Sequence, residues 1–295
     1  MALFVRFWGT RGSIPTPGRS SYRYGGNTSC VEIRSGDTLF ICDGGTGLRE
    51  LGQDLLRRQD RPLVGHFLFS HMHWDHIQGF PFFAPAYLPD NTFYIYGTFA
   101  GDKRFHSLLS GQMRSSYFPV DFSELNSHVA STDLGDAGAR LIDGVLVRSF
   151  EQCHPGGSYA YSLEKDDKKV VYATDNELDL TLADPDLPKR EPNAPRILPA
   201  RMVEFCRGAD LLIADGQYTD SEYLRYSGWG HARATTVVDL AVQAGVKQLA
   251  IYHHDPMQTD REVEMKIEAC RQRAARLGSP LFVFAAREGI ELKIS

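Results

Sequence analysis

Three histidines and one aspartate stand close together, directly after an apolar segment that ends at Ser70: His71, His73, Asp75 and His76. Alternate side chains of an extended segment point to the same side, so His71 and His73 can hold one metal ion between their imidazoles. Asp75 and His76 follow where the chain turns into a helix, and they can face a second ion. The spacing therefore predicts a metal centre rather than a polar surface cluster.

Further candidate ligands follow other strand-like segments. His154, Asp175 and His253 each stand at the carboxyl end of a segment rich in apolar and β-branched residues. A single polar residue at such a place is common in loops, but their joint occurrence predicts one centre built from several strand ends. Because His254 is the next residue, the sequence leaves open which of the two histidines is the ligand. The strand end favours His253 as the ligand and His254 as a supporting or substrate-contacting group.

His231 lies in Gly228-Trp229-Gly230-His231, immediately before a helix-like segment. Two roles fit this place: capping of the helix, or proton donation to a leaving group near neutral pH. Two divalent ions about 3.5–4 Å apart lower the pKa of a shared water, and the resulting bridging hydroxide can attack a phosphodiester in line. The leaving alkoxide then needs a proton, and we expect His231 to supply it. Zinc is the expected ion, with manganese and iron as alternatives that suit the same ligands.

The elements that must position these residues alternate along the chain. Apolar stripes at helical spacing predict helices over residues 47–58, 233–244 and 260–277. β-branched and aromatic runs predict strands over 3–8, 30–34, 38–42, 65–70, 93–96, 145–150, 158–164, 168–174, 210–214, 248–253 and 281–285. Residues 184–200 hold five of the fifteen prolines and are predicted to form an ordered surface loop whose role the sequence leaves open.

Composition excludes several classes of protein. The 295 residues, 42% hydrophobic and 23% charged, are typical of a globular chain with a sizeable core. A net charge of −5 gives no electrostatic footprint for a nucleic-acid backbone. The five cysteines lack short pair spacings, which predicts reduced thiols. Without a visible signal peptide or membrane span, we expect a cytoplasmic protein with no membrane partner.

The run His71-Met72-His73-Trp74-Asp75-His76 matches the His-x-His-x-Asp-His signature of the metallo-β-lactamase superfamily, which the chain resembles over nearly its whole length. Gly9-Thr10-Arg11-Gly12-Ser13, Asp43-Gly44-Gly45, His154, Asp175 and His253 follow the expected order. The resemblance implies an α/β fold, a four-layer αββα sandwich, as a single hydrolase domain over residues 1–295. It implies one metal on His71, His73 and His154, another on Asp75, His76 and His253, and Asp175 as the bridge. Asp75 is also expected to act in catalysis.

Within the superfamily, Gly230-His231-Ala232 followed by Thr235 resembles the Gly-His-Ser-Thr-type loop of the ribonuclease Z and phosphodiesterase branch. Asp175 disfavours class B β-lactamases, and the intact second histidine of the motif disfavours flavo-diiron proteins. His254-Asp255-Pro256 replaces the Ser-x-Arg continuation of ribonuclease Z, and no glycine- and proline-rich basic arm is visible.

The surroundings are closer to bacterial class II cyclic-nucleotide phosphodiesterase-like proteins, which share Gly25-Gly26-Asn27-Thr28-Ser29 and Gln78-Gly79-Phe80-Pro81. Asn27, Thr28 and His254 are candidate substrate contacts, although a hairpin turn explains the Gly-Gly-Asn run equally well. We expect a dinuclear phosphodiesterase for a small phosphodiester, with a cyclic nucleotide the leading candidate. The alternatives are a ribonuclease Z-like 3′-end RNA endonuclease and a non-catalytic metal-binding scaffold. Nucleic acid is not the expected partner, and the oligomeric state is left open, a homodimer included.

Overall fold

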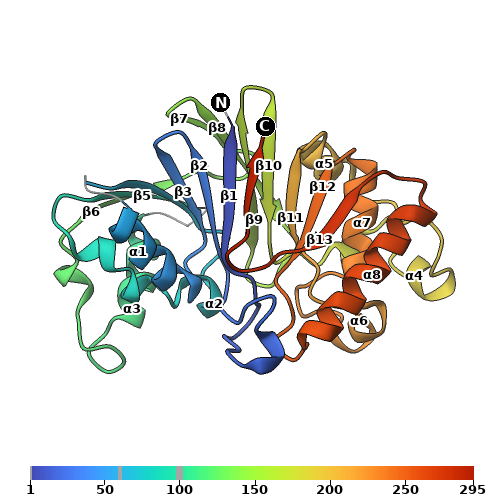
Figure 1. Cartoon of the computed structure of the whole chain (residues 1–295), viewed down its shortest axis with the longest axis horizontal. Coiled ribbons are helices and arrows are strands. Elements are labelled where there is room, and N and C mark those ends of the chain that lie inside the picture. The colour runs from blue at the N-terminus through green and yellow to red at the C-terminus, as the bar shows by residue number, and fades with distance from the viewer. Residues whose placement is uncertain (1, 59–61, 98–101) are drawn as a thin grey trace.

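Two seven-stranded sheets face each other in the computed structural model, which describes residues 2–58, 62–97 and 102–295, the side chains of 102–106 excepted. The first sheet has the order β14-β1-β2-β3-β4-β5-β6. Its strands are β1 (Leu3–Gly9), β2 (Cys30–Ser35), β3 (Thr38–Cys42), β4 (Val64–Leu68), β5 (Thr92–Gly97), β6 (His128–Asp133) and β14 (Glu291–Ile294). The termini lie side by side because β14 pairs antiparallel with β1 (Figure 1).

The second sheet repeats this plan with the order β13-β12-β11-β10-β9-β8-β7. Its strands are β7 (Ala139–Ile142), β8 (Val145–Gln152), β9 (Ser158–Lys165), β10 (Lys168–Ala173), β11 (Leu211–Asp215), β12 (Gln248–Tyr252) and β13 (Phe282–Ala285). Each sheet is antiparallel on one side and parallel on the other, from β3 to β6 and from β10 to β13. The carboxyl ends of the parallel strands therefore meet at one edge of each sheet, where polar loops can converge.

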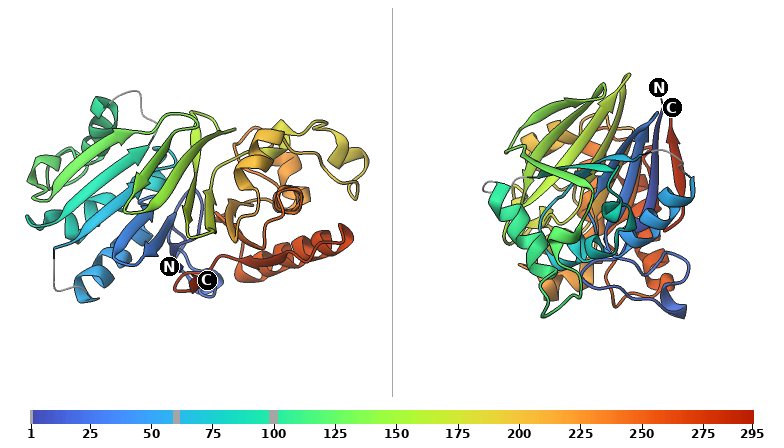
Figure 2. Two further views of the ribbon diagram at one scale, coloured as in Figure 1. Left: turned by 90° about the horizontal axis from the view of Figure 1, so that it is seen from above. Right: turned by 90° about the vertical axis from the view of Figure 1, so that its left-hand side faces the viewer.

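Helices cover the outer face of each sheet, at the two ends of the molecule (Figure 2). The first sheet carries α1 (Gly47–Arg58), α2 (Trp74–Ile77) and α3 (Asp102–Gln112). The second carries α4 (Leu187–Arg190), α5 (Ala200–Cys206), α6 (Asp220–Tyr226), α7 (Ala234–Gln243) and α8 (Asp260–Arg276). Short 3-10 helices lie at η1 (Arg19–Ser21), η2 (Phe80–Phe82), η3 (Ala84–Tyr87), η4 (Phe122–Glu124) and η5 (Leu178–Thr181).

Three apolar clusters hold the layers together. One lies between the two sheets and includes Phe7, Phe40 and Tyr172, all with no exposed surface. The other two join each sheet to its helices, through Leu51 of α1 and through Val237 of α7. This layering is what amphipathic strands and helices produce when each buries its apolar face. The expectation of a four-layer αββα sandwich is confirmed.

Most predicted elements agree with the structure, and three strands were not predicted. Strands β6 and β7 have mostly half-buried or exposed residues and lack the apolar alternation that reveals a strand. Strand β14 alternates polar and apolar residues, but over only four residues. Residues 184–200 form the short helix α4 and otherwise irregular chain, which packs on α7 through Arg196. All five cysteines are free thiols. None of the helices in the described residues combines the length and apolar character needed to cross a membrane.

Candidate metal centre

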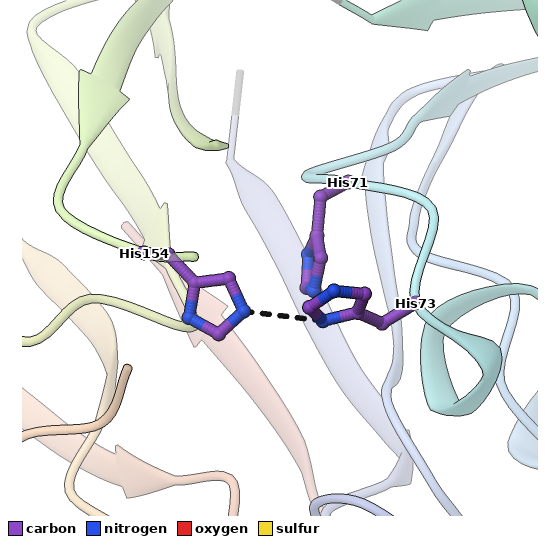
Figure 3. A group of neighbouring side chains, drawn as sticks. All are labelled: His71, His73 and His154. Carbon is purple, nitrogen blue, oxygen red and sulfur yellow. Dashed lines mark hydrogen bonds between the residues drawn. The ribbon is translucent and has the colours of Figure 1, made fainter. Parts of the chain in front are cut away.

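Three histidine rings converge where the loops after β4 and β8 meet. Figure 3 shows His154 facing His71 and His73, with His154 Nε2 3.2 Å from His73 Nδ1. One ring nitrogen from each of the three lies within 4.8 Å of the others. Ring nitrogens that point at one another in this way are arranged as ligands around one cation. His71 and His73 lie on the same side of their segment, as expected from the alternation of side chains.

A second group of possible ligands lies beside the first. Asp75 Oδ2 is 3.3 Å from His76 Nε2 and 3.2 Å from His253 Nε2. Asp75 and His76 come from α2, and His253 follows β12 directly. His253 has a φ of 56°, a left-handed conformation that a non-glycine residue adopts only when its surroundings enforce it. Of the two adjacent histidines, His253, and not His254, belongs to a group whose possible ligand atoms lie within 4.8 Å of one another.

Asp175 lies between the two groups. Its Oδ1 is 3.3 Å from both His76 Nε2 and His253 Nε2. Its Oδ2 is 3.6 Å from His71 Nε2 and 3.8 Å from His154 Nε2. One carboxylate oxygen thus faces each group, which is the geometry of a bridging ligand.

The side chains present fit divalent ions. The Nε2 atoms of His71 and His76 are buried and have no hydrogen-bond partner, and buried polar atoms of this kind need one. A bound cation would supply that partner for both. Burial lowers the pKa of His71 well below its usual value, and burial also lowers the pKa of His154. Both shifts favour the neutral imidazole that a metal requires.

Hydrogen bonds from the outer side orient the ligand rings. His76 Nδ1 lies 2.8 Å from Asp43 Oδ2, and His253 Nδ1 lies 2.9 Å from Gln217 Oε1. His154 Nδ1 is 2.8 Å from the Gly230 carbonyl oxygen. When Nδ1 donates to these acceptors, Nε2 is left free for a metal. Asp43 and Gly230 belong to segments that the sequence analysis named, whereas Gln217 was not predicted.

His231 lies at the opening of the centre and is paired with a buried acid. Its Nδ1 is 2.8 Å from Oδ2 of Asp215, the last residue of β11. Burial alone would lower the pKa of His231, but the neighbouring carboxylates, Asp215 above all and then Asp175 and Asp75, outweigh burial and raise the pKa to about 9. The alternative role as a helix cap is wrong, because Arg233 occupies the N-cap of α7 and no side chain caps that helix.

The three expected substrate contacts form hydrogen bonds within the protein. Thr28 and His254 have no exposed surface. The Thr28 hydroxyl oxygen accepts from the Thr46 amide at 2.9 Å, and His254 Nε2 is 3.0 Å from the Ala286 carbonyl oxygen. The Asn27 side chain donates to Glu288 at 3.1 Å. The expectation of direct substrate contact is therefore wrong for Thr28 and His254, whereas contact by the partly exposed Asn27 stays a prediction.

A cleft of about 470 Å³ opens onto the centre. It is lined by Ser13, Met72, His73, Trp74, Asp75, Asp175 and His231. No lysine or arginine stands among these described lining residues. Trp74 is 77% exposed, which is unusual for so large an aromatic side chain. A larger groove of about 750 Å³ lies between Phe150 of β8 and Phe205 of α5, but it holds none of the ligand residues.

Comparison with known proteins agrees with this geometry. The family model described as "Beta-lactamase superfamily domain" matches residues 38–254, a span that contains every candidate ligand. The chain belongs to this superfamily. It is accordingly a hydrolase of the metal-dependent kind, and its fold implies divalent metal ions.

Relatives and solved structures extend the comparison. Ribonuclease Z of Halobacterium salinarum is 25% identical over 288 residues, which cover 86% of this chain and 87% of the relative. The metallo-beta-lactamase fold protein YhfI from Bacillus subtilis has a TM-score of 0.70 at 18% identity, with 99% of each chain covered. The short form of human tRNase Z has a TM-score of 0.66 at 18% identity, again with 99% of each chain covered. These two structures share the fold of this member of the beta-lactamase superfamily.

Proposed function

We propose that this chain is a dinuclear metal-dependent phosphodiesterase that hydrolyses a small phosphodiester, with a cyclic nucleotide as the leading substrate. The observation that carries the proposal is Asp175, which presents one oxygen to His71 and His154 and the other to His76 and His253. We assign His71, His73 and His154 to one ion, and Asp75, His76 and His253 to the other. Zinc is the proposed metal.

The residues around the cleft divide the chemistry between them. Two bound ions would neutralise the phosphate oxygens and activate the attacking water. His231 donates a proton to the leaving oxygen, and Asp215 holds its ring by the bond to Nδ1. We assign Asp75 a catalytic as well as a ligand role because it lines the cleft beside His231. Its Oδ2 is held in place by the Ser13 amide, which donates to it at 2.7 Å.

The lining of the cleft supports a small substrate with a nucleobase. A polyanion gains affinity from lysine and arginine side chains, and the described lining residues include neither. The exposed face of Trp74 offers a platform on which one base can stack, an interaction worth about 1–3 kcal/mol. A cyclic nucleotide carries one phosphodiester charge for the metal centre and one base for this tryptophan.

A second candidate is a ribonuclease Z-like 3′-end RNA endonuclease. It is favoured by the similarity to ribonuclease Z over most of the chain. The net charge of −5 and the absence of basic residues among the described cleft lining count against it. The proline-rich segment 184–200 is attached to α7 at the buried Arg196, whose backbone amide donates to Asp239 Oδ1 at 2.9 Å, and this attachment does not favour a free basic arm.

Parallel assays on zinc-loaded protein distinguish the two candidates. We expect hydrolysis of cyclic mononucleotides with a Michaelis constant that changes little with salt, and no cleavage of precursor tRNA. An RNA substrate instead loses affinity steeply with salt, because binding releases counterions. Efficient tRNA cleavage at a discrete 3′ site would establish the second candidate. Full zinc occupancy without turnover of either substrate would instead favour the third alternative, a non-catalytic metal-binding scaffold.

A further inference from the structure

A buried carboxylate outside the ligand set is bound to the loop that carries His231. Glu177 is 1% exposed and stands two residues after Asp175. Its Oε1 accepts from the Gly228 amide at 2.6 Å, and its Oε2 accepts from the Gly230 amide at 2.7 Å. The Tyr223 hydroxyl also donates to Oε1 at 2.7 Å. One side chain therefore fixes both ends of the short loop around Trp229.

The same loop contacts the metal centre. The Gly230 carbonyl oxygen receives the bond from His154 Nδ1 at 2.8 Å, and His231 is the next residue. The backbone at Gly230 has a φ of 92°, and a Cβ there would lie 2.4 Å from His154 Nδ1. The Gly230 backbone and the His154 ring are therefore in close contact. Movement of the loop would displace the His154 ring, the His231 ring, or both.

The backbone of Glu177 reinforces the connection from the other side. Its amide donates to the carbonyl oxygen of Cys153, the residue before His154, at 2.7 Å. The neighbouring Asn176 accepts from the Cys153 amide through Oδ1 at 3.1 Å. The His154 loop and the 228–231 loop are thus both attached to the segment that follows β10.

We propose that Glu177 is a positioning residue, which orients the metal ligand His154 and the proton donor His231 together through the 228–231 loop. The part that concerns His231 rests on the proposed function, whereas the part that concerns His154 rests on the ligand geometry alone. A carboxylate suits this task because both of its oxygens accept. In the isosteric glutamine, the side-chain NH₂ would face a backbone N–H. One of the two hydrogen bonds from the Gly228 and Gly230 amides would then be lost.

The variant Glu177→Gln tests the proposal against a purely structural role. Zinc affinity is measured by competition with a chromophoric chelator, and hydrolysis is measured with an alkoxide and with a nitrophenolate leaving group. We expect one of the two zinc ions to bind about 10–100-fold more weakly, the range typical for loss of a partner behind a metal ligand. We also expect the alkoxide reaction to slow more than the nitrophenolate reaction.

Tyr223→Phe is the matched control. It removes one hydrogen bond to Glu177 but leaves both loop amides bound, so zinc affinity and the leaving-group ratio should stay at wild-type values. If Glu177→Gln does not fold, Glu177→Asp makes the same test, because its shorter side chain cannot reach both amides. Wild-type zinc affinity and an unchanged leaving-group ratio in the folded variant, with only a lower melting temperature, would overturn the proposal. The zinc result stands even if wild-type protein hydrolyses neither substrate.

Discussion

Asp215 and His231 form a buried pair, with Oδ2 and Nδ1 2.8 Å apart at the opening of the metal centre. The two residues come from different elements, since Asp215 ends β11 and His231 precedes α7. The carboxylate fixes the ring and favours its protonated form. A proton donor is needed only when the leaving group is a poor one, so this pair has a specific kinetic signature.

Replacement of His231 should separate proton donation from metal binding. In His231→Ala we expect both ions to remain bound while hydrolysis with a ribose alkoxide leaving group falls by about 10²–10⁴-fold. A nitrophenolate departs without a proton, so its rate should fall only slightly. Rates with the two leaving groups, each normalised to bound zinc, check this. Equal losses for both leaving groups would remove His231 from the donor role.

Loss of one ligand should instead release the ion that this ligand holds. His73 lies in the first ligand group and lines the cleft, so His73→Ala should lose the first ion and hydrolysis together. Metal analysis of the purified variant measures the occupancy. His128→Ala is a suitable control, since His128 is exposed on β6 and belongs to none of the ligand groups. Full occupancy and normal turnover in His73→Ala would refute the ligand assignment.

Trp74 should determine affinity for the base. Removal of a stacking interaction worth about 1–3 kcal/mol raises the Michaelis constant roughly 5–150-fold, with kcat nearly unchanged. We expect this split in Trp74→Ala with a cyclic nucleotide, measured by steady-state kinetics. Tyr22→Ala removes an aromatic ring that is even more exposed, at 90%, but lies outside the cleft lining, and it should have no effect. An unchanged Michaelis constant in Trp74→Ala would exclude stacking on this residue.

The sequence predicted the parts of the centre that depend on local spacing. Asp75 and His76 lie within one short helix, and strand ends indicated His154, Asp175 and His253. Glu177 and Gln217 were not predicted, because their partners are distant in sequence: Gly230 lies 53 residues after Glu177, and His253 lies 36 residues after Gln217. No local pattern identifies such pairs.

The wrong predictions have a related cause. The backbone at His253 is left-handed, with a φ of 56°, so local spacing does not say where the two adjacent rings point. His253 faces the centre, while His254 is buried towards the Ala286 carbonyl. Thr28 was associated with the site by its neighbours in sequence, yet its hydroxyl holds the Thr46 amide. Strands with polar, half-buried residues such as β6 need the neighbouring strand for their identification.

A buried lysine behind the centre should make stability depend on pH. Lys266 is 1% exposed, and its Nζ donates to the Gln217 carbonyl oxygen at 2.9 Å. Burial lowers the pKa of Lys266 from 10.5 to about 8, against the opposing effect of nearby acidic groups. Between these values the unfolded chain binds more protons than the folded chain, so the free energy of unfolding rises with pH across this window. The difference between the two pKa values corresponds to roughly 3 kcal/mol.

Urea unfolding between pH 8 and 10.5 measures this contribution. Lys266→Met should lack it, so its free energy of unfolding should rise less with pH than that of wild-type protein. Lys247→Met provides the control, because the Lys247 side chain is 65% exposed and should leave the pH dependence unchanged. The same pH dependence in Lys266→Met and wild type would show that Lys266 is not the titrating group.

The most direct test of the account is a zinc titration of chelator-treated protein, followed by release of nucleoside monophosphate from a cyclic nucleotide. Asp175 faces both ligand groups, so hydrolysis requires both ions. We predict that activity appears with bound zinc and reaches its plateau only when two ions are bound per chain. Two bound ions without hydrolysis of any cyclic nucleotide, or a plateau at a single bound ion, would contradict the dinuclear phosphodiesterase.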